Sequence, residues 1–508
     1  MRLNCGVHPA LIDDLRADLA AAAFSVDAIG SLWGPHAAAA LHRGHRVPAL
    51  RALERAGGGG PLGTLATIFV LGLPVSRARL DAALARAGAT GAAELGLVRL
   101  DGDEAAPLLD LRPYAFTDAA GTGQWWIASD LGEMALGGAI PEHHVLGVGG
   151  ASTTLSGLMV PRPVQTALDL GTGCGIQALH ASRHAQRVVA TDISQRALDL
   201  AAFNARLNGV TTIEFRLGSL FEPVAGERFD HIVSNPPFVI TPRVEGVPAY
   251  EYRDGGLVGD ALVEQVIREA GDHLEPGGIA QLLGNWEYGA ADGLDRVAAW
   301  LDGSPLDAWV VEREVQDAAL YAETWIRDGG TTSASADFDR LSAAWLDDFA
   351  SRAVTGVGFG YVTLRAAGAS TPLHRFERID GAIGRNEAGL GAHLLLCLEA
   401  HDAGAALTDA ELVRTRLLVA GDVTEERHYW PGDEHPTVMD LRQGGGFGRS
   451  VPLGTALAAV VGACDGDLPL GVICAAIAEL LEVDEGELLD EVIPSVRELL
   501  ETGMLSIV

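Results

Sequence analysis

The chain has 508 residues, of which 48% are hydrophobic and 20% charged, a composition typical of a globular protein with about two to four domains. Its formal net charge is -32, from 68 acidic and 36 basic side chains, and the sequence has no lysine. Lysine-based Schiff-base chemistry is therefore excluded. The acidic charge disfavours nucleic acid as a partner and favours a basic protein.

No apolar run reaches the roughly 18 residues that a membrane-spanning helix needs. The N-terminus has no basic stretch followed by an apolar block, so we expect no secretory signal and a cytoplasmic location. The cysteines lie far apart with no C-x-x-C pair, so we expect neither a disulfide framework nor a metal site. They are Cys5, Cys174, Cys397, Cys464 and Cys474.

The first 122 residues are predicted to form a helical, winged-helix-like domain. Leu11, Leu15 and Leu19 recur at helical spacing. Further along, the apolar runs 95–100 and 108–111 flank a polar turn at 101–104, which indicates a two-stranded ribbon. Residues 123–150 follow as a strand-rich bridge.

From about residue 161 to 366, short β-rich runs alternate with helical segments. This alternation predicts an α/β fold with a doubly wound, parallel, seven-stranded Rossmann-like sheet, and we assign residues 123–366 to that domain with its lead-in strands. The predicted strands are 167–170, 187–191, 212–216, 231–234, 279–283, 308–311 and 358–364.

Two further regions complete the predicted organisation. Residues 367–454 are expected to form an α+β connecting region, with a helix at 391–402 and a strand at 415–420. Residues 455–508 are expected to form a C-terminal winged-helix-like domain of short helices and a terminal strand. Its acidic face makes DNA docking implausible and favours a structural or protein-contact role.

A glycine-rich loop follows the first strand of the predicted sheet. Gly171, Gly173 and Gly175 have the spacing G-x-G-x-G, whereas a dinucleotide-binding loop has G-x-G-x-x-G. Asp169 precedes the loop and would repel a phosphate but can hold an ammonium group. Asp192 ends the next strand, where a carboxylate can accept hydrogen bonds from ribose hydroxyls. Alone the loop could be an ordinary turn; together with Asp192 it predicts a nucleoside cofactor.

Other residues beside these positions are candidate cofactor contacts. Ser219 could hydrogen-bond a base and Leu220 could pack on it, although both also suit a plain loop. The full predicted cofactor set is Asp169, Gly171, Thr172, Gly173, Gly175, Asp192, Ile193, Ser219, Leu220 and Asn235.

Asn235-Pro236-Pro237-Phe238 comes directly after the fourth strand and is the predicted catalytic motif. The two prolines fix the backbone and remove N–H donors, so the Asn235 side-chain oxygen and the Pro236 carbonyl can both accept hydrogen bonds from a substrate NH2. Phe238 offers an aromatic face for a planar amide or base. Such a site works mainly by positioning the nitrogen and needs no strong base.

The stretch from about 145 to 285 resembles the methyltransferase small domain group of class I S-adenosylmethionine-dependent methyltransferases. The glycine loop, Asp192 and the Asn-Pro-Pro-Phe motif carry the resemblance, and residues 252–257 and 274–278 resemble later segments of that group. The group includes release-factor glutamine-N5 and ribosomal RNA guanine-N2 methyltransferases. The resemblance implies S-adenosyl-L-methionine as cofactor. Residues 145–155, with Ser152, Thr153 and Thr154, resemble the loop that closes over it, although helix capping would also explain these hydroxyls.

The resemblance leaves the substrate open. Glutamine enzymes usually carry Tyr where this chain has Phe238, whereas Phe is more typical of guanine-N2 enzymes, which usually have a basic substrate channel. We expect a protein N-methyltransferase acting on a glutamine-type amide, with methylation of an RNA base as the alternative. A catalytically silent methyltransferase-like scaffold is a further alternative, and the loop spacing disfavours a nicotinamide oxidoreductase.

Overall fold

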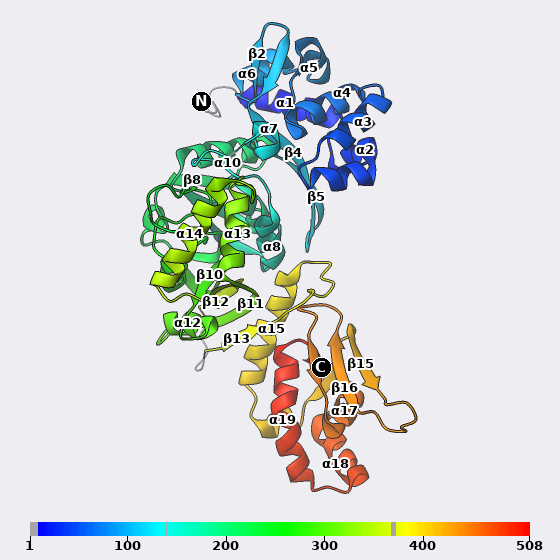
Figure 1. Ribbon diagram of the computed structural model, residues 1–508. Helices are drawn as coiled ribbons and strands as arrows, with labels where there is room; N and C mark the ends of the chain where they lie inside the picture. The colour runs from blue at the N-terminus through cyan, green and yellow to red at the C-terminus, as the bar shows by residue number, and fades with distance from the viewer. Residues whose placement is uncertain (1–8, 139, 367–371) are drawn as a thin grey trace. The chain divides into compact units, whose positions relative to one another are not determined.

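A computed structural model describes residues 9–138, 140–366 and 372–508 (Figure 1). It divides into two compact units. The first comprises Met1–Ser156, Arg162–Gly368 and His374–Arg378, and the second comprises Gly157–Pro161, Ala369–Leu373 and Ile379–Val508. Cys5 lies outside the described residues.

The N-terminal part of the first unit is helical, as predicted, and ends in a small sheet. Leu15 and Leu19 are fully buried on the first helix, which confirms the spacing. The sheet has the order β1-β3-β2. Its elements are α1 (Pro9–Ala21), α2 (Val26–Leu41), α3 (Val47–Arg55), α4 (Gly60–Leu65), the π-helix η1 (Ala66–Val70), β1 (Val75–Ser76), α5 (Arg77–Ala83), α6 (Gly88–Glu94), β2 (Val98–Asp101) and β3 (Glu104–Pro107).

The predicted ribbon forms, but with a different partner strand. β2 pairs with β3 directly across the tight turn at 101–104, whereas residues 109–111 begin the next strand, β4 (Leu109–Asp118). β4 pairs instead with β5 (Gly121–Asp130) in a long hairpin. Asn204 and Asn208 fasten this hairpin to the central domain by hydrogen bonds to the backbone of Ala128 and Trp126.

The central sheet has the order β13-β11-β12-β10-β9-β6-β7-β8. All seven predicted strands are confirmed. Two features differ from the prediction: β12 runs antiparallel to both of its neighbours, and an eighth strand, β13, extends the edge beside β11. The strands are β6 (Val164–Leu170), β7 (Ala185–Asp192), β8 (Ile213–Leu217), β9 (Phe229–Ser234), β10 (Leu274–Tyr288), β11 (Asp307–Asp317), β12 (Gly356–Arg365) and β13 (His374–Arg378).

Helices cover both faces of this sheet, which has a Rossmann-like fold. Successive residues of a strand point to opposite faces. Ala167 of β6 packs with Ala178 of α9, whereas its neighbour Leu168 packs with Val263 of α11. The helices and 3-10 turns of this region are α7 (Glu133–Leu136), α8 (Gly150–Leu158), α9 (Ile176–Ala181), α10 (Gln195–Leu207), η2 (Glu222–Val224), α11 (Ala261–Ala270), η3 (Gly271–His273), α12 (Gly293–Trp300), α13 (Ala318–Asp328) and α14 (Ala336–Ser351).

The second unit contains two three-stranded sheets and five helices in its described part. The predicted strand at 415–420 is β14, which pairs with both β18 and β19. The central strand of this sheet therefore precedes residue 455, whereas its two outer strands follow it. The elements are α15 (Leu390–Ala405), α16 (Asp409–Leu412), β14 (Arg416–Val419), β15 (Val423–His428), β16 (Val438–Gln443), β17 (Ser450–Pro452), α17 (Thr455–Gly462), β18 (Asp465–Pro469), α18 (Leu470–Leu481), α19 (Glu485–Glu501) and β19 (Leu505–Ile507).

Within the described residues, no group of three or more His, Cys, Asp or Glu side chains could hold a metal ion. No helix in that part of the chain is both long and apolar enough to span a membrane. Cys174, Cys397, Cys464 and Cys474 are all buried, and none of these four forms a disulfide bond.

Candidate functional site

The glycine-rich loop connects β6 to α9 at the carboxyl edge of the sheet. Gly171, Gly173 and Gly175 have φ values of 77°, 54° and 86°, a backbone region that side chains with a Cβ rarely adopt. Gly175 has a second constraint, because a Cβ there would lie 2.9 Å from the Cβ of Ala201 on α10. The loop therefore needs glycine both for its turns and for its packing against α10.

Asp169 lies beneath this loop with its side chain fully buried. Its Oδ2 atom accepts hydrogen bonds from Thr172 Oγ1 at 2.5 Å and from the Ala178 backbone N–H at 2.8 Å. Its Oδ1 atom is buried without a hydrogen-bond partner among the described residues. Burial raises the pKa of Asp169 to about 7. The site thus holds a carboxyl oxygen with unused acceptor capacity, suited to a cationic group.

Asp192 joins the end of β7 to the same loop. Its Oδ2 atom accepts a hydrogen bond from the Gly173 N–H at 2.9 Å, and Oδ1 accepts one from the Ser194 N–H at 2.8 Å. Burial raises the pKa of this carboxyl above its ordinary value. Each oxygen can accept a further hydrogen bond. Beside it, the apolar side chain of Ile193 is 69% exposed, so it offers a surface on which a ring could pack.

The loop after β8 approaches this carboxylate from another strand. The Gly218 N–H donates to the Asp192 backbone carbonyl at 3.0 Å. Leu220 has a φ of 45°, which is strained for a residue with a branched side chain. Ser219 and Leu220 are both half-buried and can therefore still contact a ligand. The structure thus brings the predicted cofactor residues of three strands to one edge.

The Asn235-Pro236-Pro237-Phe238 motif lies beside the glycine loop because β9 pairs with β6. Leu170 is the register partner of Ser234, and the Ser234 hydroxyl donates to the Leu170 carbonyl at 2.8 Å. Asn235 directly follows the last residue of β9, as Gly171 directly follows the last residue of β6. Its side-chain oxygen, Oδ1, is buried without a hydrogen-bond partner in the described chain. The motif therefore presents an unused acceptor next to the predicted cofactor loop.

Phe238 sits in an aromatic group that the sequence did not reveal. Its ring centroid lies 5.7 Å from that of Phe359 on β12 and 6.3 Å from that of Trp325 on α13. Phe238 also forms an isolated antiparallel bridge with Asp254, which brings the predicted glycine-rich segment 252–257 across the motif. The ring is half-buried, so one part of it is accessible to a ligand.

Two distant residues fix the chain that leaves the motif. The Tyr321 hydroxyl accepts a hydrogen bond from the Ile240 N–H at 3.1 Å. Arg253 donates to Asp328 at 2.6 Å and lies over the ring of Tyr250 at 4.5 Å. Neither Tyr321 nor Asp328 belongs to a recognisable motif, so only the fold could show that they support the site.

The segment predicted to close over a cofactor is partly anchored. The Val145 N–H donates to Asp130 Oδ2 at 2.9 Å, and the Gln177 side chain donates to the Ser152 carbonyl at 2.8 Å. The Thr153 hydroxyl donates back to the Gly150 carbonyl at 2.9 Å, which ties it to its own helix α8. These contacts tie Val145 to the end of β5 and Ser152 to α9, the helix that follows the glycine loop.

The histidines and the cysteine of this region make other contacts. His180 lies 3.1 Å from the Tyr114 hydroxyl, and His184 lies 2.9 Å from His231. Burial lowers the pKa of both His180 and His184 to about 4. Burial also raises the pKa of the Cys174 thiol to about 12, so this sulfur is not an activated nucleophile.

Comparison with known protein families identifies two segments of the chain. Residues 148–299 match the methyltransferase small domain. This family uses S-adenosylmethionine in general. Residues 21–108 match a domain of unknown function (DUF7059).

Similar curated proteins carry names of glutamine methyltransferases. The chain is 43% identical to the release factor glutamine methyltransferase of Xylella fastidiosa over 131 residues, which cover 24% of this chain and 48% of that protein. It is 36% identical to the ribosomal protein uL3 glutamine methyltransferase of Bradyrhizobium diazoefficiens over 128 residues, 23% of this chain and 40% of that protein. The chain thus spans about half the length of the curated relatives it matches.

Solved structures of methyltransferases are also similar to part of the chain. One is the 16S rRNA N2 G1207 methyltransferase of T. thermophilus, at 19% identity and a TM-score of 0.25. The match covers 42% of this chain and 55% of that one.

Proposed function

We propose that this chain is an S-adenosylmethionine-dependent N-methyltransferase that methylates a planar NH2 group, with the side-chain amide of a protein glutamine as the favoured acceptor. The observation that carries the proposal is the unpartnered side-chain oxygen of Asn235, buried beside the glycine loop. The names of the curated relatives support glutamine as the acceptor.

The acidic residues around the glycine loop fit the proposed cofactor. Asp169 has a buried oxygen free to meet an ammonium group, and Asp192 has the acceptor capacity for ribose hydroxyls. Ile193 and Leu220 supply apolar surface for a base. When bound, S-adenosylmethionine supplies an electrophilic methyl group on a sulfonium.

The residues of the motif would act by orientation. The Asn235 Oδ1 atom and the Pro236 carbonyl accept hydrogen bonds from the two N–H bonds of the substrate NH2, and the nitrogen lone pair is then directed out of the amide plane. The Phe238 ring supports the planar group. The N–C bond forms as the methyl–sulfur bond breaks, and the nitrogen, made acidic by the new bond, then loses one proton to water. The chain therefore needs no strong base, and its gain comes from holding the nitrogen in one geometry.

The acidic charge supports a protein rather than an RNA substrate. A net charge of -32 repels a phosphate backbone and attracts a basic protein surface. We therefore propose a basic cytoplasmic protein as the substrate, recognised in part by the regions outside residues 148–299.

The test is Asn235→Ala in the full chain. We expect methyl transfer to a glutamine-containing protein substrate to fall about 100-fold or more, because the NH2 loses an acceptor that orients it. Affinity for S-adenosylmethionine, measured by calorimetry, should stay within about threefold of the wild type.

Gln265→Ala is the matched control, because it removes an amide from α11 that hydrogen-bonds only Glu269 among the residues that the structure describes. It should change neither quantity. Unchanged turnover in Asn235→Ala would refute the assigned role. Methylation of RNA but not of protein would replace the proposed substrate, and failure of the wild type to bind the cofactor would refute the enzyme itself.

A further inference from the structure

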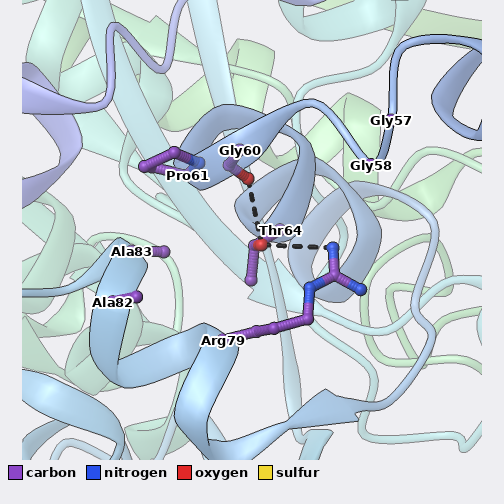
Figure 2. A pocket seen from close by; sticks show the side chains of 8 residues that line it. All are labelled: Gly57, Gly58, Gly60, Pro61, Thr64, Arg79, Ala82 and Ala83. Atoms are coloured by element: carbon purple, nitrogen blue, oxygen red, sulfur yellow. Dashed lines mark hydrogen bonds between the residues drawn. The ribbon is translucent and has the colours of Figure 1, made fainter.

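The N-terminal part of the first unit contains a hollow of about 450 Å³ that the proposed reaction does not use (Figure 2). One side is formed by Gly57, Gly58, Gly60, Pro61 and Thr64, and the other by Arg79, Ala82 and Ala83 of α5. No acidic residue lines it. The hollow lies within the segment that matches a domain of unknown function.

Arg79 is the single charged residue among those that line the hollow, and a hydrogen bond anchors its exposed side chain. Its guanidinium NH2 donates to the Thr64 hydroxyl at 3.2 Å, and that hydroxyl in turn donates to the Gly60 carbonyl at 3.0 Å (dashed lines in Figure 2). The Thr64 side chain is only 3% exposed. A buried hydroxyl therefore holds the arginine against the wall and leaves its other N–H groups for a ligand.

The neighbouring Arg77 shows what is unusual about Arg79. Both arginines lie on α5 and both donate to a threonine hydroxyl, Arg77 to Thr90 at 3.0 Å. Arg77 also lies 3.9 Å from the carboxylate of Asp81. Arg79 forms no ion pair within the described residues. In a chain with a net charge of -32, a fixed arginine that faces a hollow without a carboxylate has unused capacity for an anion.

The glycine run gives that anion close access to the backbone. Gly57, Gly58, Gly59 and Gly60 all have positive φ values, between 60° and 87°, which only glycine adopts readily. The far wall, which includes Ala82 and Ala83, is apolar and could contact the body of a small molecule.

We propose that this hollow binds a small anionic metabolite, with its phosphate or carboxylate group on Arg79 and its carbon skeleton against the apolar wall. Arg79 supplies two or more N–H donors in a rigid fork, which suits either anion. The hollow, at about 450 Å³, has room for an organic body beside the anionic group. The site is independent of the proposed methyl transfer.

The test is a calorimetric titration of the full chain with inorganic phosphate, methyl phosphate and propionate. Comparing methyl phosphate with propionate distinguishes a phosphate ligand from a carboxylate ligand. Wild type should bind methyl phosphate or propionate saturably, and more tightly than inorganic phosphate if the apolar wall contributes. Arg79→Gln should weaken binding roughly tenfold or more, because a charged hydrogen bond is lost. Thr64→Val, which keeps the shape but frees Arg79, should weaken it about threefold.

Arg77→Gln is the matched control and should bind as the wild type does. Circular dichroism and S-adenosylmethionine affinity show whether each variant is folded, and both should be unchanged. Binding of equal strength in Arg79→Gln and wild type would overturn the proposal. So would a wild-type chain that binds none of the three probes at about 10 mM, a concentration that detects even weak sites.

Discussion

Two glycine-rich turns of the first unit share a backbone conformation but differ in the charges around them. The turn at 171–175 and the turn at 57–60 are both built from glycines with positive φ. Two carboxyl groups, Asp169 and Asp192, contact the first turn, whereas Arg79 faces the second. The first turn also contains Thr172 and Cys174, and both of these side chains are buried.

This difference indicates that the glycines let a ligand approach the backbone, whereas the neighbouring side chains determine which ligand binds. A loop that meets carboxylates suits a cofactor with an ammonium and hydroxyl groups, and a loop that meets a fixed arginine suits an anion. A glycine pattern alone therefore does not identify a ligand. The following predictions test whether the two turns are as different, and as independent, as their charges indicate.

Asp192→Ala should have the largest effect. The variant removes the acceptors for ribose hydroxyls and leaves the Gly173 N–H without its partner. We expect S-adenosylmethionine affinity to fall about 100-fold, since two charge-assisted hydrogen bonds are lost. Calorimetry measures it, and methyl phosphate binding at the hollow serves as the internal control. A cofactor affinity within threefold of the wild type would contradict the role given to Asp192.

Asp169→Asn should have a smaller effect that depends on pH. Burial raises the pKa of Asp169 to about 7, so the carboxyl is ionised above that pH and mostly neutral below it. A cationic cofactor prefers the ionised form, and wild-type affinity should therefore rise as the pH increases from 6 to 8. The isosteric amide should bind about tenfold more weakly at pH 8 and show no such rise.

Stability of the same variant should change in the opposite direction. Because the folded pKa lies above the unfolded value of 3.8, the folded chain binds the proton more tightly. This contribution to stability is present below about pH 4 and is lost as the pH rises through 7. Asp169→Asn should therefore raise the thermal midpoint by about 2 °C at pH 8 and leave it unchanged at pH 4. A lower midpoint at pH 8 would show that the carboxylate stabilises the fold.

The strand pattern predicted most of the central fold because buried strands are recognisable as short apolar runs. Strand direction was not predictable from those runs: β12 is antiparallel, and its composition resembles that of its parallel neighbours. β13, with the sequence His374–Arg378, has alternating polar residues and no apolar run. The ribbon was misassigned because residues 108–111 are more apolar than the true partner, 104–107.

The site was predictable where its residues stand at strand ends. Asp192, Ser219 and Asn235 each follow a parallel strand, and the carboxyl ends of such strands meet at one edge. The structure brings them together; the roles assigned to them stay predictions. Tyr321 and Asp328 could not be found in this way, because their contacts with Ile240 and Arg253 join segments that are 81 and 75 residues apart.

The smallest predicted effects come from one glycine in each turn. Gly173 and Gly60 have φ values of 54° and 60°, and a Cβ at either position would meet nothing within 4 Å. Gly173→Ala and Gly60→Ala should therefore each lower the free energy of unfolding by about 1 kcal/mol, the cost of the backbone conformation alone. Gly175→Ala should cost more, since its Cβ also meets Ala201.

Gly173→Ala and Gly60→Ala should lower stability equally, but they should differ in which ligand they bind more weakly. Gly173→Ala places a methyl group in the carboxyl-edge turn and should weaken S-adenosylmethionine binding while methyl phosphate binding is kept. Gly60→Ala should do the reverse, because Gly60 lines the hollow. If either substitution weakened the binding of both ligands equally, the two turns would not be independent sites. The two turns would then bind parts of a single ligand or be coupled by a shared conformational change.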